Sequence, residues 1–349
     1  MNLLSRTPAW IRHPVAAVRV VVVLTLVAGL AHPLAMTAIA QVPGLHGQAQ
    51  GSPLTGAGGK PAGSTLIGQS FLDGHGDPLP AYFQTRPSNA GDGYDASASA
   101  AGNLGPESTV DVLPLPGRPD SGTRSLLTQV CARSKAVGDL EHVDGARPFC
   151  TADGVGAVLG VFKAGGTTGR ATRVVSLNQA CPARPFTATY QGVRVECARP
   201  GEDYGRAVAT PVRGGAPAHP VVPPDAVTAS GSGLDPAISP AYARLQTPRV
   251  ARERGMPEAA VRAAVDRHTS GRGLGVLGAP AVNVVELNAD LDRTHPVAGT
   301  AAGTAGDTAS STAKATSAGT AKDTAAGAAK APSSSTAKAT SSDTAKGTS

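Results

Sequence analysis

The sequence predicts a single N-terminal transmembrane helix followed by a mixed α/β extracytoplasmic domain, which carries a small β-rich, disulfide-containing insert and a disordered C-terminal tail. Three features of the 349 residues support this fold class. Residues 20–40 contain no Asp, Glu, Lys or Arg, all four cysteines lie within residues 107–219, and residues 296–349 consist almost entirely of Ala, Thr, Ser, Gly and Lys. Because Gly (43) and Pro (29) are frequent and aromatic residues make up only 3% of the chain, loops and linkers take a large share of it.

The apolar run at residues 20–40 is long enough to cross the hydrocarbon core of a bilayer as a helix. Three arginines precede it, and the first acidic residue of the chain is Asp73. Positive charge beside a membrane helix favours the cytoplasmic side, so we expect residues 1–19 in the cytoplasm and the chain beyond about Gln41 on the other side. This predicts a single-pass protein of the cell membrane, in contact with membrane lipid, with an extracytoplasmic main domain.

A cleaved signal peptide is the alternative to a membrane anchor, since Ala38-Ile39-Ala40 fits the small-x-small pattern of a cleavage site. The run is longer than the usual apolar core of a signal peptide, which favours the anchor. The main domain is exported in both cases. Pro33 lacks a backbone N–H and should kink the helix.

The formal net charge of +6 does not indicate a nucleic-acid partner. Most of the excess positive charge lies in the N-terminal arginines and in the lysines of the C-terminal tail. No basic stripe interleaved with aromatic residues lies between them, and nucleic-acid binding needs such a surface.

Residues 41–106 form the first part of the outer domain. A strand is predicted at residues 63–71, and the frequent prolines that follow predict loops. Asp73, His75 and Asp77 alternate as in a metal-binding loop, but the glutamate that would complete a calcium loop is missing. We therefore expect a glycine-rich turn there and no metal site.

Residues 107–219 form the insert. An even number of cysteines in an exported segment predicts two disulfides, and all three ways of pairing them stay open. Zinc sites use closely spaced ligand pairs, which these cysteines do not provide. Strands are predicted at residues 155–162, 172–178 and 187–196. The four cysteines are Cys131, Cys150, Cys181 and Cys197.

Residues 220–295 form the second part of the outer domain. Ser239 is expected to cap a helix that starts at Pro240 and runs to Gly255 with a bend at Pro248. A second helix is predicted at residues 257–272 and a buried strand at residues 282–287. The tail at residues 296–349 cannot bury enough apolar surface to fold.

Two glycine-rich stretches resemble phosphate-binding motifs. Residues 273–278 satisfy G-x-G-x-x-G, but a helix precedes them and a strand follows, which is the reverse of a dinucleotide-binding unit. Residues 227–240, "VTASGSGLDPAISP", have no G-K-[ST] after their glycines. No nucleophile and base can be paired by motif, so the sequence predicts no catalytic residues and no enzyme.

Six blocks, taken together and in order, resemble the KdpC subunit of the high-affinity potassium-transporting ATPase. They are "AHPLAMTAIAQ", "GSTLIGQSF", "YFQTRPSNAGDGYDASASAAGNLGP", "VTASGSGLDPAISP", "LQTPRVARERG" and "HTSGRGLGVLGAPAVNVVELNADLD". The resemblance covers about residues 31–106 and 221–292. The cysteine-containing insert replaces what is usually a short helical connection, and the tail is additional.

The resemblance implies a non-catalytic accessory subunit of an ATP-driven potassium uptake pump. Its partners would be a potassium-channel-like subunit, a P-type ATPase subunit that hydrolyses ATP, and a small stabilising subunit. The family is described as a catalytic chaperone that raises the ATP affinity of the ATPase subunit. This implies nucleotide contact at Gln246, with Ser230, Gly231, Ser232 and Gly233 as neighbours.

The topology of the chain points to a structural role for these residues instead. It places Gln246 outside the cytoplasm, whereas ATP is inside, and the hydrocarbon core between them is about 30 Å thick. We therefore expect no cofactor bound by the chain itself, an effect of ATP only through the partner ATPase subunit, and a tight turn at the Ser/Gly stretch, with direct phosphate binding as the alternative. The alternative function is an exported, membrane-anchored binding module for cell-surface polymers.

Overall fold

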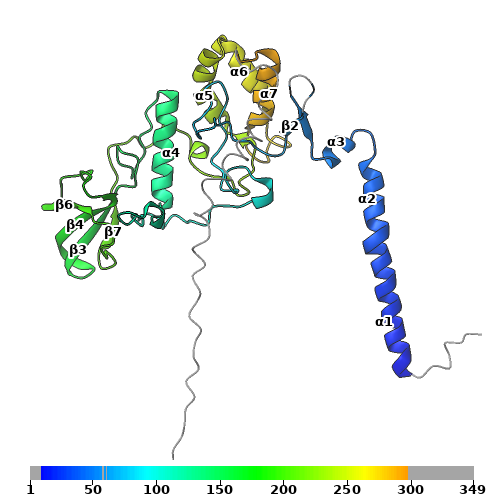
Figure 1. The fold of residues 1–349 in the computed structure, drawn as a ribbon, viewed down its shortest axis with the longest axis horizontal. Helices are drawn as coiled ribbons and strands as arrows, with labels where there is room; N and C mark the ends of the chain where they lie inside the picture. Colours follow the sequence, from blue (N-terminus) through cyan, green and yellow to red (C-terminus); the bar gives the residue numbers. More distant parts are fainter. Residues whose placement is uncertain (1–8, 57–58, 60, 298–349) are drawn as a thin grey trace, which may run out of the picture.

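The computed structural model describes residues 9–56, 59 and 61–297. The expectations for the first eight residues and for the tail beyond Val297 lie outside these residues. The described chain is a mixed α/β body attached to one long N-terminal helix (Figure 1).

The N-terminal helix consists of α1 (Ala9–Leu26), the π-helical turn η2 (Val27–Ala31) and α2 (His32–Ala40). The most apolar 18-residue stretch within residues 13–40 has a mean hydropathy of 2.3, and none of it is buried against other described residues. Among the described residues this is the one helix that is long and apolar enough to cross a membrane. The helix begins before the predicted residue 20. The π-helical turn ends at Ala31, two residues before Pro33, and the N–H of His32 bonds the carbonyl of Val27, which lies five residues earlier. Such turns accommodate a residue that cannot donate its own backbone hydrogen bond.

The connector after the membrane helix contains α3 (His46–Ala49) and the strands β1 (Pro53–Thr55) and β2 (Pro61–Ser64), which pair antiparallel. The strand predicted at residues 63–71 is confirmed only at residues 63–64, which belong to β2, and is wrong beyond Ser64. After β2 the chain turns, with the Leu66 N–H donating to the Ser64 hydroxyl, and Leu66 is 61% exposed. Two adjacent apolar residues were too short a signal to separate a strand from a turn.

The main body packs α5 (Pro240–Glu253), α6 (Glu258–Arg267) and α7 (Val284–Thr294) around a small antiparallel sheet. The order in this sheet is β8–β10–β9, and its strands are β8 (Ala237–Ile238), β9 (Thr269–Ser270) and β10 (Ala281–Asn283). The predicted cap is confirmed, since the Ser239 hydroxyl accepts the N–H of Tyr242, and α5 continues through Pro248.

The buried strand predicted at residues 282–287 is wrong in its second half. Asn283 ends β10, and its side chain accepts the N–H groups of Val285 and Glu286, so it caps α7. An Asn with a Glu three residues later is a helix-start signal, and here it outweighs the β-branched valines. The helix predicted at residues 257–272 ends early, at Arg267.

The insert contains a five-stranded sheet in the order β5–β6–β4–β3–β7. The strands are β3 (Val158–Gly165), β4 (Thr168–Ala180), β5 (Thr189–Tyr190), β6 (Val193–Ala198) and β7 (Val208–Pro211). The two disulfides join Cys131 to Cys150 and Cys181 to Cys197, which resolves the pairing that the sequence left open. Short 3-10 turns lie at Ala96–Ala98, Pro119–Ser121 and Pro224–Ala226.

The insert also contains a helix that the sequence did not predict, α4 (Leu126–Glu141), so it is not purely β-rich. This helix lies between the five-stranded sheet and the α5–α7 body (Figure 1). Leu127 packs against one face of the sheet, whereas Val130 and Val137 pack against the core of the main body. The insert therefore shares a helix with the main domain and is not a separate appendage.

Candidate functional site

The polar centre of the main body forms around an extended segment, Tyr82–Gln84, which is not part of any described sheet. The side-chain amide of Gln246 bonds both backbone groups of Gln84. Its oxygen accepts the Gln84 N–H at 2.6 Å, and its nitrogen donates to the Gln84 carbonyl at 3.0 Å. Gln246 is 0% exposed and comes from the middle of α5.

Asn288 of α7 makes the same arrangement one residue earlier. Its amide oxygen accepts the Phe83 N–H at 3.0 Å, and its amide nitrogen donates to the Phe83 carbonyl at 2.9 Å. A buried backbone without a strand neighbour would otherwise leave its polar groups unpaired. Two side-chain amides from two helices thus take the place of adjacent strands, and we call this arrangement the amide clamp.

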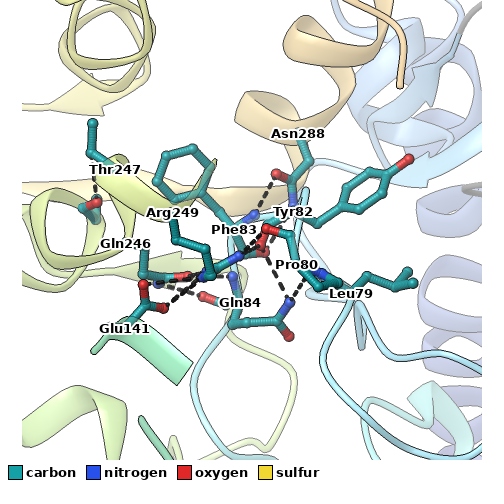
Figure 2. A network of polar contacts seen from close by, with 11 residues as sticks. Leu79, Pro80, Tyr82, Phe83, Gln84, Glu141, Gln246, Thr247, Arg249 and Asn288 are labelled. Atoms are coloured by element: carbon teal, nitrogen blue, oxygen red, sulfur yellow. Dashed lines mark hydrogen bonds and ion pairs between the residues drawn. The ribbon is translucent and has the colours of Figure 1, made fainter. Parts of the chain in front are cut away.

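Arg249 joins the amide clamp to the insert (Figure 2). Its guanidinium donates to the carbonyls of Pro80 and Tyr82 and to the side-chain oxygen of Gln246. Nε donates to the two Glu141 carboxylate oxygens at 3.0 and 3.1 Å, and Nη2 lies 3.0 Å from Oε1 of the same carboxylate. The side chains of Arg249 and Glu141 are 2% and 1% exposed, so this ion pair between α5 and α4 is buried.

Burial raises the pKa of Glu141, because the charged carboxylate loses its water, and the hydrogen bonds from Arg249 oppose this shift. Burial also raises the pKa of Tyr242, which lies on the same face of α5. The site is therefore a desolvated polar centre in which the side chains of Gln246, Asn288, Arg249 and Glu141 all have partners within the chain.

The Ser/Gly stretch, residues 230–233, bonds the part of the chain that follows Gln84. The Gly233 carbonyl accepts the Ser88 hydroxyl at 2.6 Å, and the Ser232 carbonyl accepts the Ala100 N–H at 3.1 Å. Gly233 has a φ of +71°, and a Cβ there would lie 2.8 Å from the Ala90 nitrogen. Ser230 is buried, whereas Gly231 and Ser232 are exposed. This is a tight turn packed against residues 88–100.

Gln246 and the Ser/Gly stretch thus bind neighbouring parts of residues 84–88. Gln246 bonds Gln84, and the Ser/Gly stretch bonds Ser88. Both polar atoms of the Gln246 side chain are already bonded within the protein. A nucleotide could reach this amide only if the amide clamp opened. The arrangement can hold the domain together, and it offers no reacting group to a substrate.

The roles of Arg249, Glu141 and Asn288 were not predicted from the sequence. One signal was available, because Gln246 and Arg249 fall on the helix face that also carries the apolar residues Ala243 and Val250. Polar residues on an otherwise apolar helix face need partners. Their partners lie more than 100 positions away in the chain, and only the fold identifies them.

The alternating Asp73, His75 and Asp77 form a turn. The Asp73 carboxylate accepts the N–H groups of His75 and Asp77, which lowers the pKa of Asp73. Over residues 9–56, 59 and 61–297 no group of three or more His, Cys, Asp or Glu side chains is placed to hold a metal ion. His268 caps the C-terminal end of α6, and its ring contacts Asp290 of α7 at 3.2 Å.

Comparisons with known proteins agree on one family. The family model described as "K+-transporting ATPase, c chain" (KdpC) matches residues 15–112 and 202–293, which include the membrane helix and both parts of the main body. The chain is 33% identical over 286 residues to a potassium-transporting ATPase KdpC subunit of Koribacter versatilis, covering 82% of this chain and 97% of that relative. It is 34% identical over 272 residues to the corresponding subunit of Caulobacter vibrioides, covering 78% of this chain and 88% of that relative.

Proposed function

This chain belongs to the KdpC family of K+-transporting ATPase c chains, and we propose that it acts as a non-catalytic accessory subunit of a membrane-bound potassium pump. The observation that carries the proposal is the extent of the match. It includes the membrane helix from residue 15 and both sequence segments that meet at the amide clamp. The proposed task is to complete and stabilise the assembled pump, while a partner P-type ATPase subunit hydrolyses ATP.

The proposed partners are a potassium-channel-like subunit, the P-type ATPase subunit and a small stabilising subunit. The membrane helix supports this assembly, since residues 13–40 are not buried against any other part of the chain that the structure describes. A helix with Pro33 and a π-helical turn leaves backbone groups that a neighbouring helix can cover. Lipid surrounds the remaining surface of the helix.

We propose that the main domain lies on the extracytoplasmic side. The arginines before the apolar run support this orientation through the positive-inside rule. The two disulfides also support it, because such bonds persist in oxidising compartments.

We further propose that any effect on the ATP affinity of the pump is indirect. Gln246, the residue that the family resemblance associates with the nucleotide, is fully buried and bonded to Gln84. An effect on ATP would then pass through the membrane helix and the packing of the partner subunits, as a coupling free energy between distant sites.

The test is potassium-stimulated ATPase activity in membranes over a range of ATP concentrations, with the chain deleted and then restored. Deletion should abolish activity or raise the ATP concentration that is needed, and restoration should reverse the change. Unchanged activity after deletion would reject the accessory role. The exported module that binds cell-surface polymers would then be tested by pull-down of the full chain on isolated cell wall.

A further inference from the structure

The connection between β9 and β10, residues 271–280, carries an exposed apolar tip. Leu274 is 92% exposed, Val276 is 76% exposed and Leu277 is 62% exposed. A group of apolar side chains with this exposure is typical of a surface that contacts a partner or a membrane. We call residues 272–277 the apolar tip.

The apolar tip is an ordered hairpin. Gly273 and Leu277 exchange both backbone hydrogen bonds at 2.8 Å, and the Gly275 N–H bonds the Arg272 carbonyl. A Cβ added at Gly271, Gly275 or Gly278 would meet no atom within 4 Å. The tip therefore projects from the body with its shape set by its own backbone, and the described part of the chain leaves its side chains uncovered.

The base of the hairpin is tied to the segment that leaves the membrane helix. Asn283, at the end of β10, donates to the Thr65 carbonyl at 2.8 Å. The Thr65 N–H in turn bonds the carbonyl of Ser52 at 3.1 Å, and Ser52 lies in the connector that follows Ala40. Figure 1 shows β2 and α3 between α7 and the top of α2. The hairpin therefore projects from the side of the main body that lies next to the membrane helix.

The charge next to the apolar tip also fits a membrane surface. Arg272 is exposed and belongs to no ion pair among the described residues, whereas the nearby Arg267 is paired with Asp290. A cationic side chain beside exposed Leu and Val is the arrangement found where a peptide lies at the headgroup boundary. Anionic lipid headgroups attract such a charge.

We propose that the apolar tip dips into the lipid bilayer beside the membrane helix. Leu274, Val276 and Leu277 would contact acyl chains, and Arg272 would lie against an anionic headgroup. A protein partner fits the observations less well, because a stable protein interface covers about 800 Å² on each side and needs a shaped surface. A narrow tip flanked by glycines offers little such surface, and lipid requires none.

The test uses the full chain in vesicles of phosphatidylcholine and phosphatidylglycerol. No described cysteine is free, so a single Leu277→Cys substitution can carry an environment-sensitive fluorophore. The matched control is Val112→Cys, at an equally exposed apolar position before α4. Spin-labelled lipids should quench the fluorophore at residue 277 several-fold more strongly than at residue 112. Adding Leu274→Ser and Val276→Ser should remove most of this difference.

The charge is tested separately. Arg272→Gln should reduce quenching at residue 277 in vesicles that contain phosphatidylglycerol and leave it unchanged in phosphatidylcholine alone. Equal quenching at residues 277 and 112 would overturn the proposal. So would shielding of residue 277 that appears only when the other pump subunits are added, since that would identify a protein contact. The proposal does not rest on pump activity, so either result leaves the accessory role to its own test.

Discussion

The side-chain amide of Gln246 bonds the backbone of Gln84 at both its N–H and its carbonyl, 162 positions away in the sequence. It does for Gln84 what a neighbouring strand would do in a sheet. The family resemblance associates this glutamine with a nucleotide, whereas in the structure both polar atoms of its side chain bond the backbone and stabilise the fold. Its substitution should therefore affect stability first.

Gln246→Ala should lower the free energy of unfolding by about 2–6 kcal/mol, because it leaves two buried backbone groups of Gln84 unpaired at about 1–3 kcal/mol each. Denaturant unfolding of the full chain in detergent measures the loss. Gln48→Ala, at an exposed glutamine of α3, is the control and should change stability by less than about 0.5 kcal/mol. A stable Gln246→Ala protein with weakened ATP dependence in the assembled pump would contradict the structural role.

The buried Arg249–Glu141 pair should hold α4 of the insert against α5. Replacing either partner alone, by Arg249→Met or Glu141→Leu, should cost about 3–5 kcal/mol, since each leaves an unpaired charge in a desolvated site. The double variant should cost clearly less than the sum of the two. A double-mutant cycle by denaturant unfolding measures this coupling, and strict additivity would show that the two side chains do not interact in solution.

Two glycines of the Ser/Gly stretch distinguish a packed turn from a phosphate loop. Gly233→Ala should destabilise the domain by about 2–4 kcal/mol, because its φ is positive and the new Cβ would meet the backbone of Ala90 and Ala100. Gly231→Ala should be neutral within about 0.5 kcal/mol, since no atom lies within 4 Å of its Cβ position. Thermal unfolding of the two variants checks the contrast. If Gly231→Ala weakened ATP dependence at unchanged stability, the phosphate-binding alternative would be supported.

Tyr94 should make the domain less stable at alkaline pH. Burial raises the pKa of Tyr94 to about 12 from the ordinary value of 10.0, because the phenolate would lose its water. The folded state then keeps a proton that the unfolded state releases, so the contribution is fully present below pH 10 and falls as the pH rises towards 12. The loss should approach about 1.4 kcal/mol for each unit of pKa difference.

Tyr94→Phe isolates this contribution from the other titrating groups. The variant loses the hydrogen bond from the Tyr94 hydroxyl to the Arg86 carbonyl, so it should be less stable at neutral pH. The gap between the variant and the parent protein should narrow between pH 10 and pH 12. A gap that stays constant over this range would show that Tyr94 titrates in the same way in the folded and unfolded states.

The sequence predicted those features that depend on neighbouring residues. The membrane helix, the Ser239 cap of α5 and three stretches of the insert sheet follow from local composition, capping and alternation. Three errors have local causes as well. Leu66 and Ile67 were too few to define a strand, the valines at residues 284–285 hid the cap at Asn283, and α4 has too little apolar periodicity along its length to stand out.

The candidate site could be predicted only in part. The family resemblance pointed to Gln246, and the glycine-rich composition drew attention to the Ser/Gly stretch. Neither indicated that both hold residues 84–88, or that Glu141 from the insert would complete the partners of Arg249. The family resemblance supplied a functional context, and the contacts supplied the physical role.

The membrane helix, the four cysteines that form two disulfides and the family can all be read from the sequence, because they depend on hydropathy, composition and short ordered motifs. Which cysteines pair, where α4 packs and what Gln246 bonds become known only from the folded chain. Those outcomes depend on bringing together groups that lie up to 205 positions apart, as with Asn288 and Phe83. A buried polar atom has to find a partner wherever the fold places one, and its neighbours in sequence do not specify that place.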